Sequence, residues 1–349
     1  MGLVGRPLLV LAVTLAALAP LVVVAWWRRG RAGSALGLLG RLLAVLLCQV
    51  LAVSALFLAV NDQYSFYTSW SDVLGRRSAP TGIETGGLLQ PGQGRVEVLT
   101  VHGSPGTGGS HQVLAWLPPQ YDEPGQAATR FPVLMVLPGQ PSTPEAMFSH
   151  YDFAATASAE ISSGRVPPFV AVFPPLMTDP PRDTECTDVP GGPQADTWLR
   201  TDVPAAVDHD LRTTHEPWGL FGWSTGAFCS AKLVLQDPHR FAAAAGLGGY
   251  YAPLTDHTTG DLFHGSAHRR ALNSPAWLYR RTGLQGRRLL LVSGRKDPES
   301  YPQTASFLRL AAGDRAVSSV IFPTGGHNYR NYATYLGPAL RWWAGTTGG

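Results

Sequence analysis

The sequence is poor in cysteine and in charged residues, and it lacks the short motifs of common zinc sites. Three cysteines occur in 349 residues, and neither a CxxC nor an HExxH motif is present. Charged residues make up 15% of the chain, whereas soluble proteins typically contain roughly 25%. The missing charge is concentrated near the N-terminus. This asymmetry predicts a membrane part followed by a soluble part.

The small net charge of +3 gives no indication of a nucleic-acid partner. Part of the arginine excess lies between two apolar runs and does not form a stripe along a folded face. A metal site is also not expected. His257, His264 and His268, together with Asp256 and Asp261, match no known ligand spacing, so this segment is predicted to be a polar loop.

Two long apolar runs near the N-terminus predict a transmembrane hairpin, with helices at residues 7–27 and 42–60. About 20 apolar residues are needed to cross the hydrocarbon core of a membrane. The connection between the runs contains four arginines, and short loops with positive charge stay on the cytoplasmic side. These arginines are Arg28, Arg29, Arg31 and Arg41. Both termini and the soluble domain are therefore predicted to lie outside the cytoplasmic membrane.

A cleaved secretory signal is the alternative, but its apolar stretch usually spans only about 7 to 15 residues. Several aromatic residues fall where the belts at membrane interfaces are expected, although the last three could instead pack on the soluble domain. They are Trp26, Trp27, Tyr64, Tyr67 and Trp70. We expect a membrane anchor over residues 1–62, a juxtamembrane linker over 63–94 and a catalytic domain over 95–349.

The soluble part alternates short apolar runs with segments of helical length. Continuous apolar runs of four to eight residues are typical of a mostly parallel sheet that is covered on both faces. Strands are predicted at 96–101, 113–117, 132–137, 169–173, 218–221, 242–247, 289–292 and 317–322, and the first two form a hairpin through the glycine-rich residues 103–109. Helices are predicted at 144–160, 196–212, 225–237, 302–312 and 330–344. The fold class is therefore a doubly wound α/β domain. Residues 250–286 are longer than a normal connection and could form a lid or a substrate wall.

The pentapeptide from Gly222 to Gly226 predicts a serine nucleophile. It reads Gly-Trp-Ser-Thr-Gly, follows an apolar strand and opens an amphipathic helix. A GxSxG motif in this context is the nucleophile elbow, in which glycines avoid collisions and the serine hydroxyl is presented above the sheet. Ser224 is therefore the predicted nucleophile.

A serine hydroxyl needs an adjacent histidine base, which in turn is oriented by a carboxylate. After a nucleophile elbow the chain order is serine, acid, histidine. Asp297 follows the strand 289–292, and Glu299, two residues further on, is the second choice for the acid. His327 follows the last strand and is the only histidine of the ten with this placement. The predicted triad is Ser224, Asp297 and His327.

Acyl transfer also needs donors for the oxyanion that develops in the transition state. One donor should be the backbone N–H of Thr225, directly after the nucleophile. The second should come from the loop after the strand 132–137, where Pro138 and Pro141 have no N–H. We predict Gln140 as this second donor.

Two cysteines, Cys186 and Cys229, occur in the soluble part, whereas Cys48 lies inside an apolar run. In an exported domain a remaining pair could form one disulfide. Two unrelated buried thiols are the alternative. If the pair is bridged, it attaches the loop around Cys186 to the helix that follows Ser224.

These motifs resemble the putative esterase family that includes esterase D and the antigen 85 mycolyltransferases, and especially its actinobacterial members with an N-terminal membrane segment. The resemblance covers roughly residues 95–345 and rests on four stretches of sequence. They are Leu137-Pro138-Gly139-Gln140, the pentapeptide at Ser224, Asp237-Pro238 and Gly326-His327. It implies an α/β-hydrolase fold with the triad and the oxyanion donors named above.

One departure from the family affects the predicted reaction. The mycolyltransferases use a glutamate as the acid and have an arginine after the oxyanion-hole residue, where this chain has Pro141. The departure favours hydrolysis of an ester or acyl-lipid substrate, without a cofactor, over transfer of the acyl group to a sugar or lipid acceptor. A catalytically silent binding protein on a hydrolase scaffold is a further alternative, and the intact Ser, acid and His argue against it.

Overall fold

The computed structural model describes residues 6–29, 35–64 and 89–345. The chain divides into two compact units, Met1–Pro80 and Thr81–Gly349. Most of the predicted juxtamembrane linker at 63–94 lies outside the described residues, as do Arg31, Tyr67 and Trp70.

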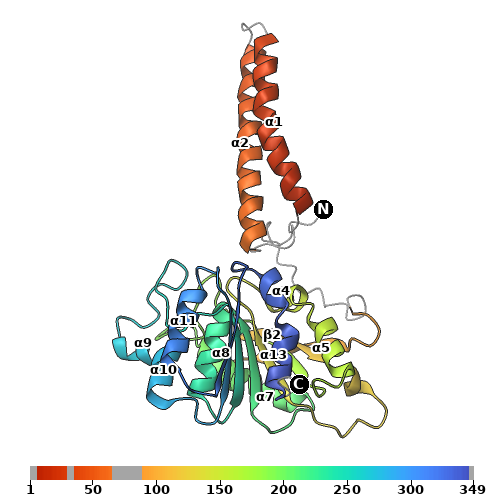
Figure 1. The fold of residues 1–349 in the computed structure, drawn as a ribbon, viewed down its shortest axis with the longest axis vertical. Helices are drawn as coiled ribbons and strands as arrows, with labels where there is room; N and C mark the ends of the chain where they lie inside the picture. Colours follow the sequence, from red (N-terminus) through yellow and green to blue (C-terminus); the bar gives the residue numbers. More distant parts are fainter. Residues whose placement is uncertain (1–5, 30–34, 65–88, 346–349) are drawn as a thin grey trace. The chain divides into compact units, whose positions relative to one another are not determined.

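The N-terminal unit is a hairpin of two helices, α1 (Arg6–Arg29) and α2 (Ala35–Tyr64), which lie side by side (Figure 1). Their apolar spans, Pro7–Trp27 and Gly37–Asn61, are long and apolar enough to cross a membrane. Among the described residues, Leu254 and Leu272 are the only exposed large hydrophobic residues outside these helices. Such a concentration of exposed apolar side chains is typical of a surface that is covered by a membrane or by another protein.

The second helix begins earlier than the predicted start at residue 42. Arg41 therefore lies within α2 and not in the connection, so this detail of the prediction is wrong. The helix continues because leucines occupy positions 36, 38 and 39 and because arginine is a good helix former. The Arg41 guanidinium lies over the ring of Trp27, 5.2 Å from its centroid. A long arginine stem can lie along apolar surface in this way while its charge stays near the end of the hairpin.

The second unit is built on a sheet of eight strands in the order β1-β2-β4-β3-β5-β6-β7-β8. β2 pairs with β1 and β4 in antiparallel fashion, and all other pairs are parallel. The strands are β1 (Arg95–His102), β2 (Ser110–Leu117), β3 (Val133–Leu137), β4 (Val170–Phe173), β5 (Trp218–Trp223), β6 (Phe241–Leu247), β7 (Arg288–Gly294) and β8 (Val317–Phe322). All eight predicted strands and the predicted mostly parallel sheet are confirmed.

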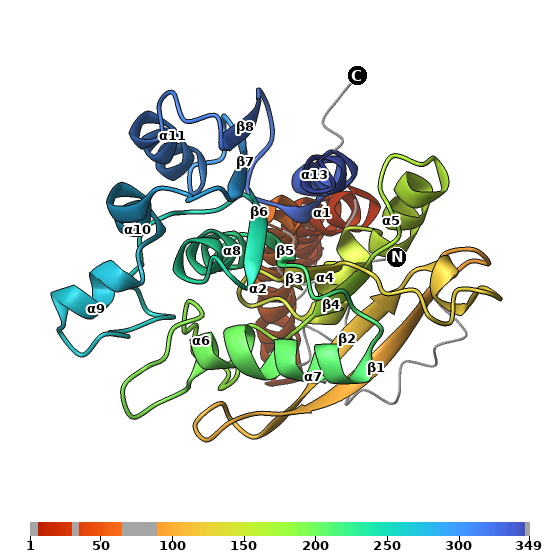
Figure 2. The same ribbon diagram turned by 90° about the horizontal axis from the view of Figure 1, so that it is seen from below.

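Helices cover both faces of this sheet and enclose two apolar cores. On one face α7, α8, α10 and α11 contribute to one core, and on the other α4, α5, α12 and α13 contribute to the second. Figure 2 shows α8 and α13 on opposite sides of the central strands. The helical segments are η1 (Pro119–Asp122), α4 (Pro144–His150), α5 (Phe153–Ser162), α6 (Ala195–Thr197), η2 (Trp198–Asp202), α7 (Val203–Asp210), α8 (Thr225–Gln236), α9 (Ala267–Leu272), α10 (Pro275–Thr282), α11 (Tyr301–Leu310), α12 (Tyr329–Ala333) and α13 (Leu336–Trp343).

Three predicted helices are interrupted in the structure. The helix expected at 144–160 is split into α4 and α5 by Asp152, whose φ of 44° is left-handed. The helix expected at 196–212 consists of α6, the π-helical segment η2 and α7, and the one expected at 330–344 consists of α12 and α13. Apolar periodicity continues through each interruption because both pieces face the same core, so a pattern search cannot detect the break.

The long connection at 250–286 contains α9 and α10, which the apolar pattern does not predict. Each helix begins at a serine whose Oγ accepts a backbone N–H, Ser266 from Arg269 and Ser274 from Trp277. Pro275 occupies the first position of α10. A serine cap followed by proline is a helix-start signal that could have been read from the sequence.

Candidate active site

The turn between β5 and α8 holds Ser224 in a strained conformation. Its φ of 55° and ψ of −118° are sparsely populated by residues with a side chain. A Cβ on Gly222 would lie 2.0 Å from the carbonyl oxygen of Gly226, and one on Gly226 would lie 2.0 Å from that of Leu137. Both positions therefore require glycine. The tight turn leaves the Ser224 side chain partly exposed at the carboxyl end of β5.

The structure brings Ser224, His327 and Asp297 into one hydrogen-bonded chain. The Oγ of Ser224 lies 2.9 Å from Nε2 of His327. The Nδ1 of the same imidazole lies 2.9 Å from Oδ2 of Asp297. The three residues follow β5, β8 and β7, which are parallel, so their carboxyl ends meet at one edge of the sheet.

Asp297 is buried and accepts four hydrogen bonds. Oδ2 accepts from Nδ1 of His327 and, at 2.5 Å, from the hydroxyl of Tyr332. Oδ1 accepts from the backbone N–H groups of Glu299 and Ser300, both at 3.0 Å. Burial alone would raise the pKa of Asp297, but these bonds outweigh it and hold the pKa below its usual range. The carboxylate therefore stays charged beside the imidazole.

The imidazole itself is held by aromatic packing. The Trp223 ring stacks on His327 with 5.1 Å between ring centroids, and His327 is 7% exposed. A Cβ on Gly248 would lie 3.3 Å from Cε1 of the imidazole, so the chain passes close on that side. Sequence reasoning did not identify Trp223 or Tyr332 as part of the site. Trp223 occupies one of the two positions that the GxSxG motif leaves unspecified, and Tyr332 is marked by no motif.

Glu299, the second choice for the acid, lies on the opposite side of the imidazole. Its Oε2 is 3.7 Å from Nε2 of His327, and its side chain is 59% exposed. Asp297 contacts Nδ1 instead. The structure thus separates the two candidates: Asp297 is placed where an orienting acid belongs, and Glu299 lies at the solvent side of the nitrogen that faces Ser224.

The loop after β3 passes directly beside the nucleophile. A Cβ on Gly139 would lie 3.0 Å from Cβ of Ser224, so only glycine permits this approach. Gln140 follows in this loop, and Thr225 begins α8. Among the hydrogen bonds of residues 89–345, the backbone N–H of neither Gln140 nor Thr225 donates to a protein acceptor. Thr225 follows Ser224 in the chain, and Gln140 follows the glycine that approaches Ser224, so both N–H groups remain available near the nucleophile.

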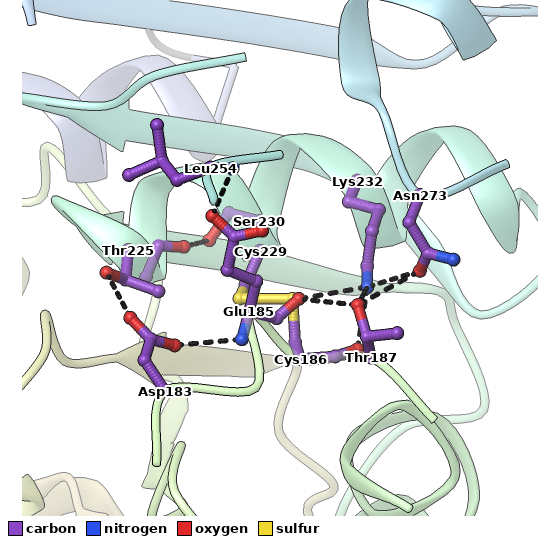
Figure 3. The surroundings of a disulfide bond; sticks show 11 residues. Asp183, Glu185, Cys186, Thr187, Thr225, Cys229, Ser230, Lys232, Leu254 and Asn273 are labelled. Atoms are coloured by element: carbon purple, nitrogen blue, oxygen red, sulfur yellow. Dashed lines mark hydrogen bonds between the residues drawn. A yellow bond between two sulfur atoms is a disulfide. The ribbon is translucent and has the colours of Figure 1, made fainter. Parts of the chain in front are cut away.

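Cys186 and Cys229 form a disulfide that joins the loop after β4 to α8 (Figure 3). Lys232, buried on the same helix, donates to the carbonyl oxygen of Cys186 at 2.7 Å and to Oδ1 of Asn273 at 3.0 Å. Burial lowers the pKa of Lys232 to about 8. The hydroxyl of Thr225 donates to Asp183 at 3.2 Å. The loop is therefore attached to the helix at several points, beginning at the residue that follows the nucleophile.

Removing this disulfide is expected to destabilise the catalytic unit. The two cysteines are 43 residues apart, and closing a loop of this size stabilises a protein by about 2–4 kcal/mol. Unfolding of the Cys186→Ala/Cys229→Ala protein in urea should show this loss relative to the wild type. Cys48→Ala is the matched control, because Cys48 is a free cysteine in α2. Equal urea midpoints for the double variant and the control would contradict the prediction.

Asp256, His257, Asp261 and His264 lie in a loop, as predicted, but His268 lies in α9, so for this residue the prediction is wrong. Two aspartate side chains of the loop accept backbone N–H groups. Asp256 accepts the N–H groups of Thr258 and Thr259 through Oδ1. Asp261 accepts those of Phe263 and Gly265. Within the described part of the chain, no cluster of three or more His, Cys, Asp or Glu residues is arranged to bind a metal ion.

Comparison with known proteins supports the same fold. An uncharacterized protein of Corynebacterium glutamicum is 24% identical in an alignment of 297 residues, which covers 78% of this chain and 66%, just under two thirds, of the relative. Among solved structures, a ferulic acid esterase (TM-score 0.61, 14% identity) matches 72% of this chain and 98% of its own. An S-formylglutathione hydrolase from Agrobacterium tumefaciens (TM-score 0.61, 17% identity) matches 74% and 98%. The MPT51 protein of Mycobacterium tuberculosis (TM-score 0.56, 16% identity) matches 72% and 99%. The α/β-hydrolase fold is confirmed.

The family comparison covers most of the second unit. The family model described as "Putative esterase" matches residues 104–342, which is more than half of the chain. This range includes the pentapeptide at Ser224 and every strand of the sheet except β1. The resemblance to the putative esterase family that was noted from the sequence is thereby confirmed. The chain belongs to the putative esterase family.

Proposed function

We propose that this protein is a membrane-anchored serine esterase whose catalytic domain faces the outside of the cytoplasmic membrane. The observation that carries the proposal is the hydrogen-bonded chain from Ser224 through His327 to Asp297. A silent binding protein would have no need for this arrangement at the strand ends of a hydrolase fold.

The reaction proceeds through an acyl-enzyme. His327 Nε2 accepts the proton of the Ser224 hydroxyl while Oγ attacks the ester carbonyl carbon. Asp297 accepts the hydrogen bond from Nδ1 and stabilises the imidazolium. The N–H groups of Gln140 and Thr225 stabilise the oxyanion. The imidazolium then delivers its proton to the departing alcohol, and water attacks the acyl-enzyme with His327 again acting as the base.

The same acyl-enzyme could be resolved by an alcohol instead of water. Pro141 stands directly after Gln140, where the mycolyltransferases have an arginine, and we therefore propose water as the acceptor. Product analysis in the presence of trehalose or a lipid alcohol distinguishes the two reactions. A transacylated product that outweighs the free acid would identify a transferase.

The location follows from the two apolar helices. Residues 1–62 act as the anchor, 63–94 as the linker and 95–349 as the catalytic domain. Arg28 and Arg29 end α1 and Arg31 follows, so the connection between the helices is placed on the cytoplasmic side by its positive charge. The even number of spans then leaves the catalytic domain outside.

A membrane-impermeant fluorophosphonate probe tests the nucleophile and the location together. Applied to intact cells, the probe should label the wild type at Ser224 and leave Ser224→Ala unlabelled. Ser230→Ala is the matched control, because the Ser230 hydroxyl is buried in α8 and bonds the carbonyl oxygen of Gly226; this variant should label like the wild type. Labelling that appears only after lysis would refute the external location. No labelling in lysed cells would refute the serine hydrolase.

A further inference from the structure

Glu299 places a carboxylate at the exposed side of the imidazole that serves Ser224. Its Oε2 lies 3.7 Å from Nε2 of His327, and Ser224 Oγ lies 2.9 Å from the same nitrogen. The side chain is 59% exposed, so it borders the opening of the site and not its interior. The backbone position is fixed, because the N–H of Glu299 donates to Asp297.

The chemistry of ester cleavage brings the substrate's alcohol to this carboxylate. The departing oxygen takes its proton from Nε2 of His327, so it must come within hydrogen-bond distance of that nitrogen. The atoms attached to this oxygen therefore lie within a few ångströms of Glu299, whichever ester is bound. The acyl group, in contrast, is bonded to the carbonyl carbon at Ser224.

Within the described residues, Glu299 forms no ion pair with a lysine or an arginine. Arg295, in the same loop, instead donates to the hydroxyl of Tyr301 at 3.0 Å and lies over its ring. Asp297 differs, because its carboxylate is buried and accepts four hydrogen bonds. Glu299 is therefore the exposed carboxylate that borders the alcohol side of the site.

We infer that Glu299 determines specificity for the alcohol part of the substrate, favouring alcohols with a cationic group over neutral ones and disfavouring anionic ones. The inference rests on the proposed esterase function and specifies its substrate class. For a charge pair near an exposed surface, a discrimination of about three- to tenfold is expected at low salt. Added salt should reduce this discrimination, since Glu299 is exposed.

Three esters with one acyl group and matched alcohols provide the test. Butyrylcholine is cationic, 3,3-dimethylbutyl butyrate is its neutral analogue of nearly the same shape, and 3-sulfopropyl butyrate is anionic. We expect wild-type kcat/KM to fall in that order. In Glu299→Gln the ratio of cationic to neutral kcat/KM should fall about three- to tenfold, and in Glu299→Lys the anionic ester should be preferred over the cationic one.

Glu216→Gln is the control, because it removes the same charge from an exposed residue near the start of β5, at the opposite end of the strand from Ser224. It should retain the wild-type ratios. If the wild type is active and both Glu299→Gln and Glu299→Lys keep its kcat/KM ratios between the esters, this inference alone is overturned. A wild type that cleaves none of the esters and takes up no fluorophosphonate would overturn the esterase function itself. Fluorophosphonate labelling of both variants shows that the site is folded when ratios are compared.

Discussion

Replacing Asp297 with asparagine is expected to lower kcat for ester cleavage about 10⁴-fold, as loss of the carboxylate does in Ser-His-Asp enzymes. The carboxylate accepts a hydrogen bond from Nδ1 of His327. An asparagine amide can instead donate to Nδ1. The imidazole proton then lies on Nε2, so this nitrogen cannot accept the proton of Ser224. The overall fold should persist, since the two side chains have nearly the same shape. The measurement is kcat at saturating ester.

Two further variants make this prediction specific. Tyr332→Phe removes one of the four hydrogen bonds to Asp297 and leaves the charge, so a loss of about tenfold, the effect of one charge-assisted bond, is expected. Glu299→Gln should reduce kcat far less than Asp297→Asn, because Glu299 does not contact Nδ1. A larger loss of kcat in Glu299→Gln than in Asp297→Asn would mean that Glu299, and not Asp297, orients the imidazole.

Gly226→Ala is expected to destabilise the catalytic unit by about 3 kcal/mol or more, through overpacking against backbone that cannot move aside. The new Cβ would lie 2.0 Å from the carbonyl oxygen of Leu137 and 2.6 Å from that of Pro138. To relieve this contact α8 must move away from β3, and Ser224 moves with it. Activity should fall at least about 100-fold, since a displacement near 1 Å at a reacting group has this effect. Thermal unfolding and kcat/KM measure the two losses.

Gly313→Ala serves as the comparison for Gly226→Ala. Gly313 also has a backbone conformation unsuited to a side chain, with φ of +87°, but a Cβ there would meet nothing within 4 Å. Its substitution should cost about 1–2 kcal/mol and leave activity unchanged. Equal losses in the two variants would mean that the close approach of β3 and α8 is not what requires glycine at position 226.

The central strands β3 to β7 were predictable because their burial is nearly complete. In β3 all five residues are buried, so the run carries no polar interruption and stands out in the sequence. The ends of the helices were harder to predict from the sequence. Asp152 breaks the helix predicted at 144–160 through its own left-handed backbone, although the apolar residues on both sides still face one core. A pattern records which residues are buried, but not the turn that redirects the chain between them.

A residue of the candidate site could be predicted when its neighbours in the sequence form a recognisable motif. Ser224 lies within a pentapeptide whose glycines explain the turn, and His327 follows the last strand. The sequence favoured Asp297 over Glu299 as the acid but could not exclude Glu299, because both lie in one loop after β7. The bonds from two backbone N–H groups to Asp297 direct its carboxylate to Nδ1. Tyr332 and Lys232 carry no local signal, and their partners are distant in the chain.

The sequence by itself determined the α/β fold, the two apolar spans and the position of the nucleophile, because burial patterns and tight turns are properties of neighbouring residues. The tertiary structure decided which carboxylate reaches each imidazole nitrogen, which tyrosine supports Asp297 and how the loop around Cys186 is held to α8. These contacts join residues far apart in the chain, for example 30 positions for Asp297 and His327 and 43 for the two cysteines. Their geometry exists only after the strands have paired and brought the loops to one edge of the sheet.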